Sequence, residues 1–189
     1  MTHTMRGSDQ GSRPRSGLRV GETAPEFTLP DGATGAPVAL AAVSGGRDTL
    51  LVFFRGTWCP FCREQMRVLT ASQNRLARAE VSVVGVVCQS AGSVRRFLEA
   101  RSLPFPLLVD ESRSVAKAYG VHYRLSWEGF NLAAPSLFVL DQTGRITFCH
   151  VGAHMRDLPL LPILERFVGL FGGNNGSAAS APIPPTPAP

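Results

Sequence analysis

The chain has 189 residues, of which 44% are hydrophobic and 17% are charged, and its formal net charge is +5. This composition excludes a wholly disordered chain, and the length favours one domain over two. No uninterrupted apolar stretch approaches the roughly 18 residues of a membrane-spanning helix. The sequence therefore predicts a soluble protein with one core.

The positive charge is concentrated near the amino-terminal end. Residues 1–19 contain four arginines and one aspartate, and the rest of the chain is nearly neutral. A groove that follows a nucleic-acid strand needs basic residues interleaved with exposed aromatic ones, a pattern this sequence lacks. Residues 1–19 are predicted to form a flexible basic arm. They also lack the apolar run of a secretory signal, which favours a cytoplasmic protein.

The first elements of the predicted domain, which spans residues 20–171, are extended. Two short extended segments flank a turn at Asp31–Gly32, and a continuous apolar run then suits a strand buried on both faces. Apolar residues at helical spacing follow directly, as in an amphipathic helix. In chain order these segments are residues 26–29, 37–40, 49–54 and 60–79.

The alternation of strand and helix continues to residue 171. Two further strands and two helices are followed by a pair of strands joined by a short turn and by a last helix. In chain order these are residues 81–88, 93–101, 105–109, 112–119, 136–141, 145–151 and 158–171. The order predicts an α/β fold with a central mixed sheet flanked by helices. Residues 172–189, rich in Gly, Pro and Ala and uncharged, are predicted to be a disordered tail.

Two cysteines, Cys59 and Cys62, lie where the third predicted strand gives way to a helix. If Pro60 takes the first helical position, Cys59 is the N-cap, and both thiols lie on one face. The free N–H groups and the positive end of the helix dipole then stabilise a thiolate at Cys59, and the guanidinium of Arg63 or Arg55 would add to this. A thiolate attacks peroxides and disulfides, so the pair predicts a redox-active dithiol.

A zinc site is the main alternative for this pair. Such a site needs a second pair of ligands, and the candidates are Cys88, Cys149, His150 and His154. His150 and His154 have ligand-like spacing, but they lie far beyond Cys62, at the end of a predicted strand. We therefore expect no metal, and nothing in the sequence implies an organic cofactor.

The aromatic residues beside the motif and a proline much later in the chain carry weaker signals. Trp58 and Phe61 are candidates to cover the dithiol, or they belong to the core. Pro135 precedes a predicted strand, where proline is tolerated, and a cis bond there would turn the chain sharply.

The strand, the motif Trp-Cys-Pro-Phe-Cys and the later proline together resemble the thioredoxin fold. Further segments in order resemble the peroxiredoxin-like alkyl hydroperoxide reductase and thiol-specific antioxidant family over about residues 20–171. The segments that carry this resemblance are residues 20–30, 105–110, 115–121 and 138–146. The resemblance implies a thioredoxin-like fold with an N-terminal β-hairpin and with Pro135 as a cis proline that faces the dithiol.

The family's peroxidase signature, P-x-x-x-T-x-x-C, is only partly present. It places Cys62 at the peroxidatic cysteine, Cys59 at the threonine and Arg55 at the proline, and the family's later arginine falls on Pro135. Two mechanisms stay open. In the peroxiredoxin-like one, Cys62 becomes a sulfenic acid and Cys59 condenses with it. In the thioredoxin-like one, Cys59 attacks a disulfide and Cys62 resolves the product.

The sequence thus predicts a thiol-dependent antioxidant oxidoreductase that reduces hydroperoxides through a dithiol–disulfide cycle. The expected electron donor is a thioredoxin-like protein or a low-molecular-weight thiol. A protein disulfide reductase with the same dithiol is the alternative activity, and a non-catalytic binding or adaptor module on the same fold is the alternative of another class. The fold also allows oligomers.

Overall fold

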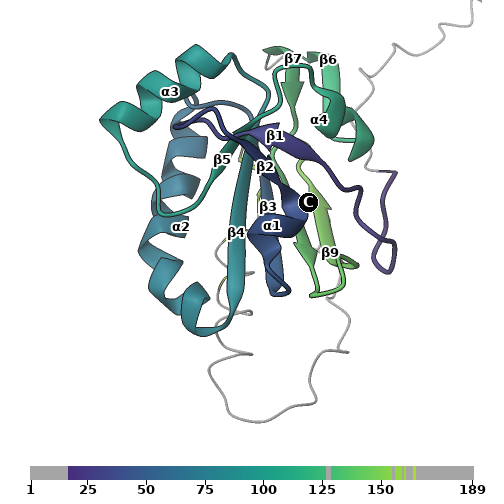
Figure 1. The fold of residues 1–189 in the computed structure, drawn as a ribbon. Coiled ribbons are helices and arrows are strands. Elements are labelled where there is room, and N and C mark those ends of the chain that lie inside the picture. Colours follow the sequence, from purple (N-terminus) through teal and green to yellow (C-terminus); the bar gives the residue numbers. More distant parts are fainter. Residues whose placement is uncertain (1–16, 127–128, 155, 159, 161–163, 165–189) are drawn as a thin grey trace, which may run out of the picture.

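The computed structural model describes residues 17–126, 129–154, 156–158, 160 and 164. A five-stranded sheet in the order β5-β4-β3-β8-β9 forms the centre of the molecule (Figure 1). Strands β3 (Asp48–Phe54), β4 (Val81–Val87) and β5 (Leu107–Val109) run parallel to one another. Strands β8 (Ser136–Leu140) and β9 (Ile146–Val151) are antiparallel to their neighbours, so the predicted mixed sheet is confirmed.

Helices cover both faces of this sheet. The long helix α2 (Pro60–Arg78) and α3 (Ala91–Ala100) pack on one face, and the short helices α1 (Leu40–Ser44) and α4 (Ser114–Ala118) lie on the other (Figure 1). No helix in the described part of the chain combines the length and the apolar character that crossing a bilayer requires.

Strand β3 contributes side chains to two separate hydrophobic clusters. Leu50, Val52 and Phe54 pack under α2 and α3, whereas Leu51 and Phe53 pack under α1 and α4. All five are at most 1% exposed. Successive side chains of a strand point to opposite faces, so a strand buried on both faces needs apolar residues at every position. The continuous apolar run therefore predicted this strand correctly.

Two hairpins flank the central sheet. The predicted N-terminal hairpin is confirmed as β1 (Thr28–Pro30) paired antiparallel with β2 (Pro37–Ala39). A second antiparallel hairpin, β6 (His122–Ser126) with β7 (Gly129–Ala133), was not predicted. The predicted last helix, the arm at residues 1–16 and the tail at residues 172–189 lie wholly or largely outside the described residues.

The carboxyl ends of β3, β4 and β5 meet at one edge of the sheet because the three strands are parallel. Helix α2 begins at this edge, six residues after the end of β3. The topology therefore brings the start of α2 next to the segments that follow β4 and β5, as is usual for sites on open α/β sheets.

Candidate active site

The dithiol motif has the local structure that the sequence predicts. Cys59 is the N-cap of α2 with extended dihedral angles (φ −75°, ψ 122°), and Pro60 follows in the first turn. The Cys59 N–H donates to the Gly56 carbonyl at 3.2 Å, which closes a tight turn between β3 and α2. The Cys59 carbonyl accepts a hydrogen bond from the Arg63 N–H at 3.0 Å, so the helix starts at the motif.

Both thiols are free but shielded. Cys59 and Cys62 are each 1% exposed, and both belong to the cluster under α2. Burial, together with the neighbouring Cys59 sulfur, raises the pKa of Cys62 to about 12, although hydrogen bonds with the backbone of Gly56 and Arg55 act in the opposite direction. Burial thus disfavours the thiolate form of Cys62. The sequence places both thiols on one face at the start of the helix, and in the structure that face is buried in the cluster under α2.

The two arginines expected beside the thiolate are held by other groups. The Arg55 Nε donates to the Tyr123 hydroxyl at 3.3 Å, and its guanidinium lies 5.3 Å from the centroid of the Trp58 ring. The Arg63 Nε donates to the Thr57 carbonyl at 2.6 Å. These contacts make both arginines supports of the turn that leads into the motif.

Trp58 packs as a cover on this turn and is not a core residue. Its side chain is 47% exposed, and a Cβ atom at Gly56 would lie only 2.3 Å from the Trp58 Nε1. Glycine is thus needed at position 56 for the ring to lie so close. Phe61 is half-buried, and the Arg156 guanidinium lies 4.7 Å from its ring centroid.

Gly56→Ala is expected to push the Trp58 ring outward, because the new methyl group would overlap three ring atoms at 2.3–2.9 Å. The cost to folding should stay near 1 kcal/mol, since a half-exposed side chain can move away. The tryptophan emission should shift to the red, measured in a Trp127→Phe background that leaves Trp58 as the single tryptophan. Gly92→Ala is the matched control, because its added Cβ meets nothing closer than 3.9 Å. An unchanged spectrum would contradict the packing described.

The expected cis bond at Pro135 is wrong: no peptide bond among the described residues is cis. The Ala134 N–H donates to the Val121 carbonyl at 2.8 Å, and the Pro135 carbonyl accepts from Gly152 at 2.8 Å. These two bonds continue the extended course of the chain into β8, so no sharp reversal is needed there.

Gln89 and Thr57 are site residues that the sequence reasoning missed. The Thr57 N–H donates to the Gln89 Oε1 at 3.0 Å, and the Gln89 Nε2 donates to the Thr57 hydroxyl at 3.0 Å. Gln89 comes just after β4, and Thr57 just after β3. Both residues follow the carboxyl ends of adjacent buried strands. This position in the sequence could have indicated that they lie close together.

Two of the residues considered for a second ligand pair, Cys88 and His150, contact carboxylates. Cys88 lies 3.9 Å from a carboxylate oxygen of Asp110, and burial raises its pKa to about 12. The His150 Nε2 lies 2.9 Å from the carboxylate of Asp157. In the described ranges, no group of three or more His, Cys, Asp or Glu residues is placed to hold a metal ion.

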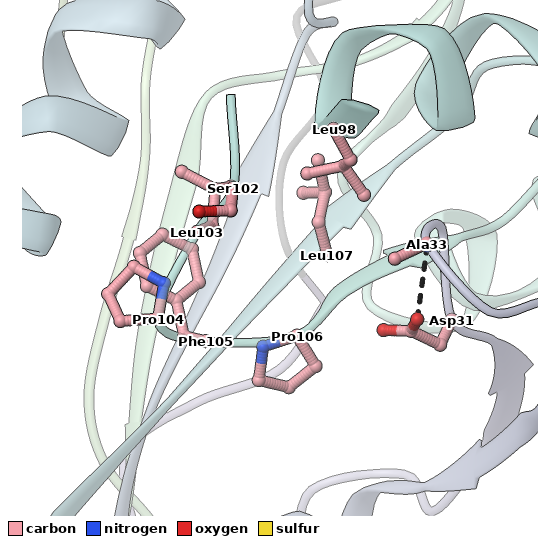
Figure 2. A pocket seen from close by; sticks show the side chains of 9 residues that line it. All are labelled: Asp31, Ala33, Leu98, Ser102, Leu103, Pro104, Phe105, Pro106 and Leu107. Carbon is pink, nitrogen blue, oxygen red and sulfur yellow. Dashed lines mark hydrogen bonds between the residues drawn. The ribbon is translucent and has the colours of Figure 1, made fainter. Parts of the chain in front are cut away.

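A cavity of about 410 Å³ opens near the end of α3 and the segment that enters β5 (Figure 2). The Asp31 carboxylate at its edge accepts a hydrogen bond from the Ala33 N–H at 3.0 Å. The lining contains no cysteine and no residue of the dithiol motif: Asp31, Ala33, Leu98, Ser102, Leu103, Pro104, Phe105, Pro106 and Leu107. This cavity is therefore separate from the dithiol.

The fold and the paired thiols define a thiol-based redox protein on a thioredoxin-like scaffold. Residues 20–149 match the model of the AhpC/TSA family. Peroxiredoxin Bcp of Escherichia coli is 32% identical over 131 residues, which cover 68% of this chain and 83% of the relative. The chloroplastic peroxiredoxin Q of Sedum lineare is 33% identical over 124 residues, 66% of this chain and 64% of the relative. The chain belongs to the AhpC/TSA family and is a thiol-dependent oxidoreductase of the peroxiredoxin type.

Solved structures agree with this fold. Peroxidoxin BcpB from Mycobacterium tuberculosis superposes with a TM-score of 0.71 at 22% identity, covering 81% of this chain and 97% of the other. A PrxQ mutant from Xylella fastidiosa gives a TM-score of 0.70 at 17% identity, with coverages of 84% and 98%. The predicted thioredoxin-like α/β fold is confirmed.

Proposed function

We propose that this peroxiredoxin reduces hydroperoxides through a dithiol–disulfide cycle of Cys59 and Cys62. The observation that carries the proposal is the arrangement of two free thiols at the first turn of α2, buried in the same cluster, with the Cys59 sulfur close enough to raise the pKa of Cys62. Two cysteines three residues apart at a helix start can form a disulfide with little movement of the backbone.

Cys59 is the attacking residue in this proposal. Burial and the neighbouring Cys59 sulfur raise the pKa of Cys62, which disfavours its thiolate form. Cys59 occupies the N-cap, where unpaired N–H groups and the helix dipole favour a negative charge. This assignment follows the helix argument and reverses the roles that the alignment with the family signature suggests.

The steps balance in atoms and electrons. The Cys59 thiolate attacks one peroxide oxygen, the O–O bond breaks, and the alkoxide or hydroxide that leaves takes up a proton. The resulting sulfenic acid reacts with the Cys62 thiol, so that an S–S bond forms and water leaves. Two equivalents of a thiol, from a thioredoxin-type protein or a small molecule, then return the pair to the dithiol and become a disulfide themselves.

The other residues of the motif have supporting roles in the proposal. Pro60 fixes the start of the helix. Trp58 shields the turn before the thiols, and Arg55 lies against its ring. Arg63 holds the carbonyl of Thr57.

One equivalent of hydrogen peroxide should convert the reduced protein into a form lighter by two hydrogens, with the bond mapped to the peptide that contains Cys59 and Cys62. Mass spectrometry of the digested, alkylated protein makes this measurement. The Cys149→Ser variant is the control and should lose the same two hydrogens. A disulfide that joins either residue to Cys88 or Cys149 would overturn the proposed cycle.

A further inference from the structure

We propose that Gln89 is a positioning residue that holds the turn before α2 closed over the dithiol and thereby sets how accessible the two thiols are. Its side-chain amide makes two hydrogen bonds to one residue. Its oxygen accepts the Thr57 N–H at 3.0 Å, and its nitrogen donates to the Thr57 hydroxyl at 3.0 Å. Thr57 is only 4% exposed, so water does not readily replace these bonds in the closed state.

Gln89 is anchored on the rigid part of the molecule. It stands two residues after the end of β4, next to Val87 and Cys88, which are 0% and 4% exposed. Val87 pairs with Phe54, the last residue of β3. The amide therefore joins the end of one core strand to the segment that leaves its neighbour.

The Thr57 peptide is held from its other side by α2 itself. The Arg63 Nε donates to the Thr57 carbonyl at 2.6 Å. Gly56 and Cys59, on either side of this peptide, are joined by a backbone hydrogen bond of 3.2 Å. The Gln89 amide thus holds the turn from Gly56 to Cys59 against the sheet. Cys59, the last residue of this turn, is the proposed nucleophile.

Removal of the Gln89 amide should raise the free energy of the closed turn and leave that of the opened turn unchanged. The buried N–H and hydroxyl of Thr57 would lose their partner in the closed turn, whereas in an opened turn both groups bind water. The population of the opened turn rises as a result, and reagents reach the sulfurs more often. The link between this opening and peroxide turnover rests on the proposed function; the effect on thiol accessibility does not.

The test compares the rates at which iodoacetamide alkylates Cys59 and Cys62 in the reduced full-length protein without peroxide, followed by mass spectrometry. Gln89→Ala is expected to raise the rate about 10- to 100-fold, the effect of one or two lost buried hydrogen bonds. Gln89→Glu retains acceptor oxygens for the Thr57 N–H and hydroxyl and should stay within about threefold of the wild type. Gln142→Ala, at an exposed glutamine in the turn between β8 and β9, is the control and should leave the rate unchanged.

Low concentrations of urea separate a local opening from a loss of overall stability. For a local opening, the alkylation rate of Gln89→Ala stays nearly constant as urea is added, because little surface is exposed. A wild-type rate in Gln89→Ala, a rate that climbs with urea as global unfolding does, or a failure of Gln89→Glu to restore slow alkylation would each overturn the proposal. Fast alkylation of Gln89→Ala in a protein whose wild type consumes no peroxide would instead uphold the role of Gln89 and refute the proposed cycle.

Discussion

Replacement of Cys59 by serine is expected to lower peroxide turnover by at least about three orders of magnitude, because it removes the nucleophile of the first step. The largest cause of the raised pKa of Cys62 is burial, which persists in this variant, whereas the contribution of the Cys59 sulfur is lost. The Cys62 thiol should react slowly at pH 7, and its reaction should speed up as the pH rises toward its pKa. The measurement is hydrogen peroxide consumption in the presence of a thiol reductant, repeated between pH 6 and pH 10.

Cys62→Ser is expected to behave differently from Cys59→Ser. It retains the attacking thiol and should consume one equivalent of peroxide rapidly, after which the sulfenic acid at Cys59 can be trapped by a dimedone-type reagent. Cys149→Ser changes a half-buried thiol outside the motif and should match the wild type. Rapid formation of a trapped sulfenic acid on Cys62 in the Cys59→Ser variant would contradict this assignment and show that Cys62 is the attacking cysteine.

Phe53→Ala is expected to lower the free energy of unfolding by about 3–5 kcal/mol, the usual cost of emptying a fully buried aromatic site. Phe53 is 0% exposed, and its ring centroid lies 5.2 Å from that of Tyr119 and 5.9 Å from that of Phe138. The cavity would therefore open between rings that pack on one another. Urea unfolding followed by circular dichroism gives the value.

Phe148→Ala provides the matched control, since it makes the same chemical change at a half-buried position on β9. Its cost should be clearly smaller than that of Phe53→Ala, because much of its ring is already hydrated. Equal losses for the two variants would show that the cluster of Phe53, Tyr119 and Phe138 contributes less than its packing indicates.

The parts of the fold with strong local patterns could be predicted from the sequence. The uninterrupted apolar run of β3 and the helical spacing of α2 place both elements, and Pro60 places the helix start within one residue. Helix α1 and the hairpin of β6 and β7 were missed, because short elements carry little periodicity of their own. The expectation of a cis Pro135 came from the resemblance and not from any local signal in the chain.

The surroundings of the thiols depend on contacts between distant parts of the chain, which the sequence did not reveal. Tyr123 stands 68 residues from its partner Arg55, and Gln89 stands 32 residues from Thr57. The burial of both cysteines likewise arises from a cluster that includes Leu137 of β8. Helix geometry alone therefore predicted where the sulfurs lie along the chain but not how they are covered.

Strand β3 has a mechanical consequence for the whole domain. Successive side chains of β3 belong to the clusters on opposite faces of the sheet. Displacement of β3 from one cluster therefore also removes its packing contacts with the other. The two layers should melt as one cooperative unit, and the amide protons of β3 should exchange with deuterium only when the entire domain unfolds. A destabilising substitution on the face opposite α2 should therefore also shorten the time that the dithiol spends in its native arrangement.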